Sequence, residues 1–346
     1  MRGRCARVAL GAAAALLLFA PLPAAHAVGP VPSSFVKGVS TNIAGWGSQG
    51  PQVAREITAI GAGWAREDLA WSGVMPNAST HDWSSFDNTL ATAKGQGLTV
   101  LPILGYAPSW TTPNDTAGYA DFVKQAVARY GPGTSANLTY FELWNEPYFG
   151  YAWQGRTPDP GQYARLYAAA VRAARTVNPN ARFLIAAENA DNPTTTGWAT
   201  TWIDDLFAAV PDLGPLIDGI SFHPYGGDPL MPSGQSGYRD LTGKWAFARI
   251  DSAHSRFQAH GVDKPFWLTE IGWSTAEVSE LEQADNYSHL FPEIHVRSWV
   301  QALFPYSLRE CCGNPTDPQQ HYGLERWPDF SHKPAYDQVK LGFAGL

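Results

Sequence analysis

From residue 35 onward, short apolar runs alternate with longer segments in which apolar side chains recur every three or four residues. The short runs are typical of buried strands, and the longer segments have the period of amphipathic helices. The predicted strands are residues 35–43, 63–69, 98–104, 138–146, 181–188, 217–225, 264–273 and 300–308. The predicted helices are residues 51–61, 83–94, 115–130, 160–177, 200–210, 238–260, 283–299 and 335–343.

These elements make eight strand–helix units that follow one another without a linker-like change of composition. A doubly wound open sheet is the alternative, but it needs no eighth unit and usually carries a phosphate-binding loop. The P-loop pattern GxxxxGK[ST] does not occur in the sequence. We therefore predict an α/β fold, a single-domain (β/α)8 barrel over residues 28–346, with its reactive groups at the C-terminal ends of the strands.

The first 27 residues are typical of a secretory signal peptide. Arg2, Arg4 and Arg7 form a basic head, an apolar run follows, and the small-x-small sequence AHA ends at Ala27. The apolar run is shorter than the ~20 residues that a membrane-spanning helix needs. We predict cleavage near Ala27 and a secreted, extracellular protein, and the Ala/Arg bias is typical of bacteria.

The net charge of -7 argues against a nucleic-acid or anionic-membrane surface, so neither partner is expected. After signal cleavage the only cysteines are the neighbours Cys311 and Cys312. They cannot staple the fold, although a strained disulfide between them is a hypothesis. We expect a monomer that is held together by its core, without a cofactor or a metal.

Polar and aromatic side chains stand where the predicted strands end. They are Arg66, Asp68 and Trp71 in the second unit, Asn145 and Glu146 in the fourth, His223 and Tyr225 in the sixth, Glu270 in the seventh and Tyr306 in the eighth. In a closed barrel, Glu146 and Glu270 should face each other across one opening. Two facing carboxyl groups, one protonated and one ionised, suit the hydrolysis of a glycosidic bond.

Three motifs, FELWNEP, SFHPYG and WLTEIGW, resemble those of the clan A retaining glycoside hydrolases, the cellulase-like (β/α)8 superfamily. The runs GAGWAREDLAWSGVMP and GLTVLPILGYAPSW most resemble its family 39-like branch, and the chain as a whole is most similar to the family 39-like and family 5-like members. The resemblance covers the chain from about residue 35. It implies a carbohydrate substrate with Glu146 as general acid/base, Glu270 as nucleophile and Asn145 as a hydrogen-bond partner of the sugar 2-hydroxyl.

The same resemblance implies that His223 and Tyr225 lie near the nucleophile, with the tyrosine hydroxyl donating to its carboxylate. It implies that Arg66 supports the nucleophile electrostatically. Many clan members carry a tryptophan at the end of strand eight, as the floor of the subsite for the non-reducing sugar. This sequence offers Tyr306 there, which leaves the substrate open.

Other carboxylates are weaker candidates for chemistry. Glu142 lies four residues before Glu146 on the same strand face, so we expect a structural carboxylate deeper in the barrel, paired with Arg66. Glu67 and Asp68 compete weakly for the nucleophile role. Glu188 and Asp191 follow the fifth strand and could touch sugar, although loop carboxylates are usually only solvated.

Tryptophans at strand ends pack more often than they bind sugar. This applies to Trp46, Trp71, Trp110, Trp153, Trp273 and Trp327. Trp110 and Trp273 are favoured as sugar platforms because they follow strand ends, and Trp71 is a further candidate for a substrate contact.

The sequence therefore predicts a retaining glycosidase that acts on β-linked oligosaccharides or polysaccharides. A transglycosylase would use the same residues, and a catalytically inactive carbohydrate-binding barrel is a third alternative. A metal-dependent hydrolase is disfavoured because no pair of strands supplies a His-x-His cluster. The sugar, the linkage and the choice between endo and exo action stay open.

Overall fold

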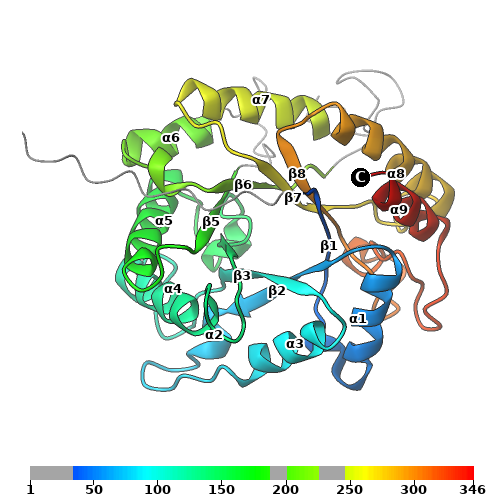
Figure 1. Cartoon of the computed structure of the whole chain (residues 1–346), viewed down its shortest axis with the longest axis horizontal. Coiled ribbons are helices and arrows are strands. Elements are labelled where there is room, and N and C mark those ends of the chain that lie inside the picture. The colour runs from blue at the N-terminus through cyan, green and yellow to red at the C-terminus, as the bar shows by residue number, and fades with distance from the viewer. Residues whose placement is uncertain (1–33, 188–200, 226–245) are drawn as a thin grey trace, which may run out of the picture. The chain divides into compact units, whose positions relative to one another are not determined.

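Eight parallel strands close into a barrel in the computed structural model, which describes residues 34–187, 201–225 and 246–346 (Figure 1). Each strand pairs with the next, and β1 pairs with β8 to close the ring. The strands are β1 Val36–Ser40, β2 Trp64–Ala70, β3 Thr99–Gly105, β4 Tyr140–Leu143, β5 Arg182–Ala186, β6 Gly219–Phe222, β7 Phe266–Ile271 and β8 Val300–Pro305. The predicted (β/α)8 barrel is confirmed, and the predicted signal segment lies outside the described residues.

Helices connect the strands and surround the barrel in Figure 1. They are α1 Gly50–Ala59, α2 Trp71–Val74, α3 Ser84–Lys94, α4 Thr116–Tyr130, α5 Pro160–Arg175, α6 Thr201–Ala209, α7 Ala246–Ala259, α8 Glu280–His295 and α9 Pro334–Gly345. Short 3-10 helices occupy Ala44–Gln49, Gly150–Trp153, Gly214–Leu216 and Pro318–Gln320. Within the described part of the chain, no helix is long and apolar enough to cross a membrane.

Side chains that accept hydrogen bonds from free backbone N–H groups set the start of several helices. Asp115 accepts from the Gly118 amide at 2.9 Å at the start of α4, and Asp159 accepts from the Gln162 amide at 3.0 Å at the start of α5. Ser279 does the same for α8, so this helix begins three residues before its predicted start. Each such cap is worth about 1 kcal/mol.

The barrel interior is filled in layers that follow the two-residue period of the strands. An apolar cluster fills the end near the strand N-termini; its members are Val36, Leu101, Tyr140, Leu184, Trp267, Ala302 and Phe304. Gly38 leaves room for the Phe304 ring, because a Cβ there would lie 2.1 Å from it. Two residues further along β2 and β4, the buried inward-facing residues are Arg66 and Glu142. A charged layer therefore follows the apolar one toward the C-terminal ends of the strands.

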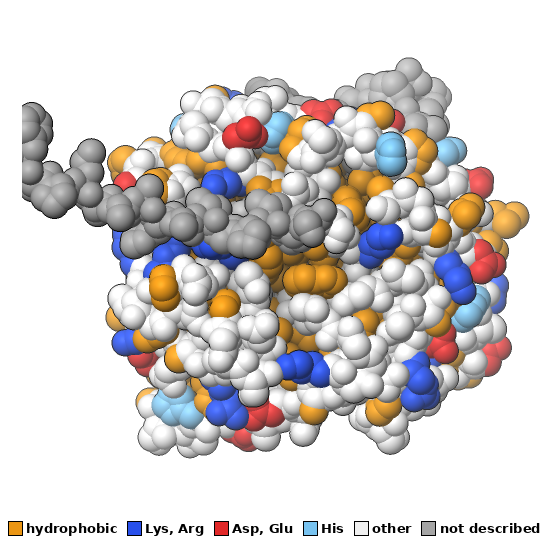
Figure 2. All heavy atoms as spheres, viewed as in Figure 1, with side chains coloured by type: hydrophobic (Ala, Val, Ile, Leu, Met, Phe, Trp, Pro, Cys, Tyr) orange, Lys and Arg blue, Asp and Glu red, His pale blue; other side chains and the backbone are white. Residues whose placement is uncertain are grey.

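Charged side chains are scattered over the face shown in Figure 2, and among the described residues neither sign gathers into an extended patch there. A nucleic acid or an anionic membrane would require clustered Lys and Arg. The Lys and Arg side chains of the described residues on this face are instead dispersed.

Candidate active site

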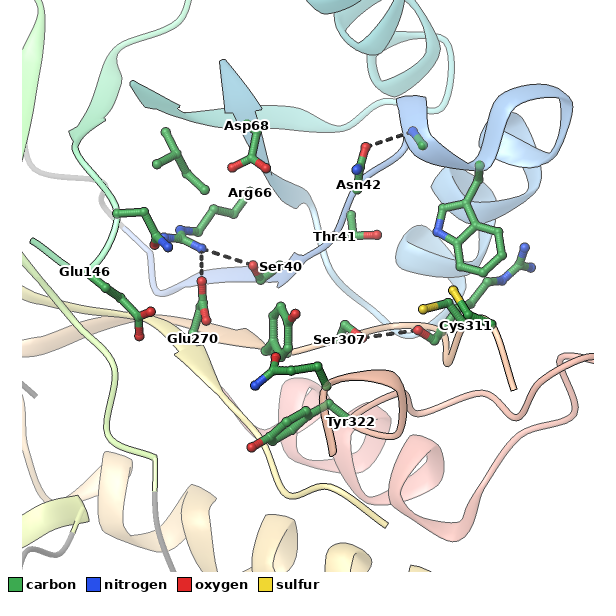
Figure 3. A pocket seen from close by; sticks show the side chains of 18 of the residues that line it. Ser40, Thr41, Asn42, Arg66, Asp68, Glu146, Glu270, Ser307, Cys311 and Tyr322 are labelled. Carbon is green, nitrogen blue, oxygen red and sulfur yellow. Dashed lines mark hydrogen bonds and ion pairs between the residues drawn. The ribbon is translucent and has the colours of Figure 1, made fainter. Parts of the chain in front are cut away.

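A cavity of about 1110 Å³ opens over the C-terminal ends of the strands (Figure 3). Arg66, Asn145, Glu146, Tyr225, Glu270 and Tyr306, all predicted from the sequence, line it. One carboxylate oxygen of Glu146 and one of Glu270 lie within 4.8 Å of each other. The chain thus brings together two acidic groups that are separated by more than a hundred residues.

Arg66 on β2 is the electrostatic centre of the site. Its guanidinium donates to Glu142 through Nε at 2.6 Å and Nη2 at 3.0 Å, which confirms the predicted pair. Its Nη1 donates to Glu270 Oε1 at 2.5 Å and to Ser40 Oγ at 3.2 Å. Its Nη2 also donates to Asn145 Oδ1 at 2.9 Å. One buried cation therefore positions a structural carboxylate, a candidate nucleophile and the amide beside the candidate acid.

Glu142 lies at the bottom of this network and is fully buried. Ser221 Oγ donates to its Oε1 at 2.5 Å, and Ser221 in turn lies 2.7 Å from Thr269 Oγ1. Thr269 Oγ1 lies 3.0 Å from His223 Nε2. With Arg66 on its other side, Glu142 has no free oxygen facing the cavity. It is a structural carboxylate, as the sequence predicts.

His223 lies beneath the two cavity glutamates and is 2% exposed. Its Nδ1 is 2.9 Å from Glu146 Oε1 and 3.7 Å from Glu270 Oε2. Burial alone would lower the pKa of the imidazole, but the charges of Glu270 and Glu146 raise it above its usual range. A protonated His223 donates from Nδ1 to Glu146 and from Nε2 to Thr269, which holds the Glu146 side chain in place.

The two glutamates differ in their surroundings. Burial raises the pKa of Glu146, the charge of Glu270 adds to the rise, and the contact with His223 opposes it. Burial acts in the same direction on Glu270. The positive charges of His223 and Arg66 and the hydrogen bond from Tyr225 outweigh it and hold the pKa of Glu270 below its usual range. Tyr225 Oη donates to Glu270 Oε2 at 2.6 Å. Glu146 is therefore suited to hold a proton while Glu270 is ionised.

The backbone after β4 turns Glu146 toward the cavity. Strand pairing ends at Leu143, earlier than predicted, because Trp144 and Glu146 both adopt positive φ, at 74° and 42°. Such backbone is costly for residues other than glycine and persists only where packing enforces it. Trp144 is buried and stacks on Trp153 at 5.3 Å between ring centroids, and the Trp153 indole donates to the Pro147 carbonyl.

Glu270 reaches the cavity through an irregularity in β7. Trp267 and Thr269 face the barrel interior, so strict alternation would turn Glu270 outward. The pairing of β7 with β8 shifts register between Leu268 and Ile271, and Glu270 lies within the shifted stretch. The local twist that accompanies such a shift re-aims its side chain toward Arg66.

Three predicted tryptophan contacts are not found in the cavity lining. Trp71 is fully buried, stacks on Phe122 at 6.0 Å and donates to Met75 Sδ, so its prediction as a substrate contact is wrong. Trp110 is 37% exposed, and its indole donates to the Met75 carbonyl. Trp273 is 4% exposed and packs edge-on against Tyr287 at 5.0 Å. Both lie outside the described lining.

Several lining residues were not singled out as substrate contacts. Tyr106, directly after β3, and Tyr322, in the segment after β8, both face the cavity, and so does Asp68. Their only sequence signal is a place at a strand end or in the long last loop. Trp46 and Trp327, which were predicted to pack, also line the cavity, with their rings 6.3 Å apart.

The remaining acidic residues and the two cysteines that the sequence singled out lie in different surroundings. Glu67 is 2% exposed, and its carboxylate accepts from the Ile43 amide at 3.0 Å. Glu188 and Asp191 lie outside the described residues. Cys311 and Cys312 line the cavity as free thiols, without the disulfide that the sequence analysis raised as a hypothesis.

A cation could be held by Glu146, His223 and Glu270 on distance alone, since one atom of each lies within 4.8 Å of the others. Arg66 already places positive charge 2.5 Å from Glu270, and a protonated His223 does the same for Glu146. Both oxygens of Glu270 accept hydrogen bonds, from Arg66 and Tyr225, and His223 Nδ1 contacts Glu146 at 2.9 Å. The atoms that would bind an ion are thus engaged by side chains, so the cluster fits acid–base and nucleophilic chemistry better than metal binding.

Several solved structures share this fold. A family 39 glycoside hydrolase from the gut symbiont Bacteroides cellulosilyticus WH2 has 21% sequence identity and a TM-score of 0.67, with 90% of this chain and 64% of that chain covered. The chain thus spans less than two thirds of that enzyme. GH5_18 from Streptomyces cattleya, solved in complex with GlcNAc, has 18% identity and a TM-score of 0.67, with 90% and 80% covered.

Xylanase 10B from Thermotoga maritima has 13% identity and a TM-score of 0.62, with 90% and 95% of the two chains covered. At these identities the likeness establishes the fold alone. Among curated protein sequences, none matches this chain. The model of the cellulase family, glycosyl hydrolase family 5, matches residues 30–301, which is most of the chain. The protein therefore belongs to glycosyl hydrolase family 5, in agreement with the resemblance of its motifs to clan A.

Proposed function

We propose that the protein is a retaining glycosidase that acts on β-linked oligosaccharides or polysaccharides, with Glu270 as nucleophile and Glu146 as general acid/base. The observation that carries the proposal is the opposite electrostatic environment of two carboxyl groups within 4.8 Å of each other. Retaining glycosidases hold these groups about 5–5.5 Å apart, whereas inverting enzymes leave about 6.5–9.5 Å for a water molecule. The short separation favours retention.

In the first step, an oxygen of Glu270 attacks the anomeric carbon while the bond from that carbon to the leaving oxygen breaks. Glu146 gives its proton to the leaving oxygen, and a glycosyl ester on Glu270 remains. In the second step, the Glu146 carboxylate takes a proton from water, and the water oxygen attacks the same carbon. The ester bond breaks, Glu270 leaves as a carboxylate, and Glu146 is again protonated.

The surrounding side chains support this division of roles. Arg66 and Tyr225 both donate to Glu270 and stabilise its charge before the attack and after the ester is cleaved. Asn145 faces the cavity beside Glu146, and its Oδ1 accepts from Arg66. That bond leaves the Asn145 amide NH2 to donate to a sugar hydroxyl. A contact to the 2-hydroxyl strengthens as the ring approaches the oxocarbenium-like transition state.

The shape of the cavity supports a substrate of several sugar units. Its lining includes both glutamates and the rings of Trp46 and Trp327, and at about 1110 Å³ it exceeds the size of an ordinary small-ligand pocket. Flat aromatic rings suit the apolar C–H faces of pyranoses. The family name points to β-glucans, and the solved relatives named above include a xylanase, so cellulose-type glucan and xylan are the first substrates to test.

The test is a pair of matched variants assayed with an activated aryl β-glycoside. Glu270→Ala should abolish turnover. Glu146→Ala should lose most activity and regain it with added azide, because azide needs no general base to attack the glycosyl ester. The configuration of the azide product reports retention. Rates near wild type in both variants would contradict the proposal. Product analysis with an added sugar acceptor separates hydrolysis from transglycosylation.

We also propose that the chain is exported and cleaved near Ala27, on the strength of the basic head and apolar run of its first residues. Mass spectrometry of the protein recovered from the culture medium tests this. A mature N-terminus close to residue 28 is expected, and the intact chain retained in cells would contradict it.

A further inference from the structure

The segment between β8 and α9 returns along the outside of the barrel, next to α1 (Figure 1). Two residues of this segment, Glu325 and His332, pair through their backbones in an antiparallel bridge. Glu56 on α1 faces them. These three side chains form a cluster of two carboxylates and one imidazole, and none of them lines the active-site cavity.

The separations within this cluster do not fit direct hydrogen bonds. His332 Nε2 lies 3.8 Å from Glu56 Oε2 and 3.8 Å from Glu325 Oε1. One atom from each residue lies within 4.8 Å of the others. Hydrogen bonds require about 2.7–3.2 Å between such atoms. Ligand atoms bound at about 2.0–2.2 Å to a shared ion are instead separated by about 3–4 Å.

Glu325 supplies an independent reason to expect a ligand. Its side chain is 1% exposed, and its Oε2 accepts from Arg309 Nε at 2.5 Å. Its Oε1 is buried without a hydrogen-bond partner among the residues that the structure describes, and it is the atom that faces His332 Nε2. A buried carboxylate oxygen without a donor is costly. A bound cation would remove that cost.

The imidazole is held in a suitable orientation. Its ring stacks on Tyr336 of α9 at 3.6 Å between centroids and 13° between planes. His332 is about half exposed, with a side-chain accessibility of 45%, so water can complete the coordination of an ion from the solvent side. Glu56 Oε2 has Tyr336 Oη at 3.5 Å, which leaves its lone pairs largely available.

We propose that Glu56, Glu325 and His332 bind one divalent transition-metal ion of the Zn²⁺ type. An imidazole with two carboxylates is a ligand set that Zn²⁺ accepts, whereas Ca²⁺ and Mg²⁺ prefer oxygen ligands alone. The ion would link the first helix of the barrel to the segment that precedes the last. It would also hold Glu325 against Arg309, whose guanidinium lies over the Phe330 ring and over the ring of Trp46, a residue that lines the cavity.

The test is Zn²⁺ binding by the full chain after metal stripping, measured by equilibrium dialysis with elemental analysis. Wild type should bind one ion per chain. Glu270→Gln should bind equally, which separates this site from the cluster of the active site. His332→Ala should weaken binding by more than about 100-fold, the upper end of the loss caused by an altered outer-shell partner. His81→Ala, at an exposed histidine outside the cluster, is the matched control and should bind as wild type does.

A second measurement keeps the test independent of folding defects. Saturating Zn²⁺ should raise the thermal midpoint of wild type and His81→Ala but not that of His332→Ala, because a ligand stabilises only the state that binds it. No binding by wild type, or equal binding by His332→Ala, would overturn the proposal. So would a thiolate-to-cobalt absorption band after Co²⁺ loading, since it would assign the ion to Cys311 and Cys312.

Discussion

Arg66→Met isolates the energetic role of the buried cation at the centre of the site. Arg66 is 1% exposed, and its two hydrogen bonds to Glu142 at 2.6 and 3.0 Å are both buried. Methionine fills a similar volume but leaves the fully buried Glu142 with Ser221 as its main donor. Breaking a buried pair from one side costs about 3–5 kcal/mol. We expect the free energy of unfolding at pH 7 to fall by that amount.

A second substitution separates the isolated charge from lost packing. In Arg66→Met/Glu142→Leu no unpaired carboxylate remains at position 142, and apolar replacement of a buried pair is often neutral or stabilising. The double variant should therefore recover most of the lost stability. Its hydrolytic activity should stay low, because Glu270 no longer receives the hydrogen bond that Arg66 Nη1 donates at 2.5 Å.

Urea unfolding followed by tryptophan fluorescence measures the stability of each variant, and aryl-glycoside hydrolysis measures kcat/KM. Arg172→Met is the matched control, since Arg172 pairs with Asp212 at 2.7 Å while both side chains are about half exposed or more. That substitution should cost about 0–1 kcal/mol. A loss below about 1 kcal/mol for Arg66→Met, or a double variant no more stable than the single one, would show that the buried Glu142 carboxylate does not depend on Arg66.

Three further results are expected. The kcat/KM of wild type should fall in acid as Glu270, with its lowered pKa, takes a proton, and in alkali as Glu146, with its raised pKa, loses one. With an activated aryl glycoside, Glu146→Gln should keep only the acid limb. An intact alkaline limb in that variant would contradict these roles. Tyr225→Phe removes a charge-assisted hydrogen bond of about 1.5–3 kcal/mol, so kcat/KM should fall by about 10–150-fold. The acid limb should also move to higher pH, and an unmoved limb would argue against this contact. Trp71→Ala should lower the free energy of unfolding by about 3–5 kcal/mol and leave KM unchanged, because the ring is buried. Trp327→Ala should raise KM for oligosaccharides and leave KM for aryl glycosides unchanged, because the ring lines the cavity. Denaturation and kinetics of both variants distinguish packing from binding.

The architecture could be predicted because it follows from local patterns. Eight apolar runs separated by amphipathic segments leave few alternatives to a closed parallel barrel. Strand alternation also predicted that Glu142 lies deeper than Glu146 on the same face, and the Arg66 contact confirms it. The ends of the strands and helices were less predictable. β4 ends at Leu143 because Trp144 and Glu146 beyond it have positive φ, which no local sequence pattern indicates.

Which tryptophans line the cavity could not be predicted from their place at strand ends. Trp71 and Trp110 both follow strand ends, yet Trp71 packs beneath Trp110 and Phe122, and Trp46 and Trp327 reach the cavity instead. Whether a ring is buried depends on which helices and loops come to lie over it. That depends on contacts between segments far apart in the chain, which residue type and position do not contain.

Strand period and strand order are local properties, so the residues alone specify the barrel, its reactive end and the presence of Glu146 and Glu270 at the ends of two strands. The direction of those side chains and their surroundings depend instead on contacts between segments that are far apart in the chain. Alternation along β7 would have turned Glu270 outward, and a register shift against β8 turned it to Arg66. Burial, the neighbouring charges and the Tyr225 hydroxyl then gave Glu146 and Glu270 opposite proton affinities, since pKa depends on what surrounds a group in space.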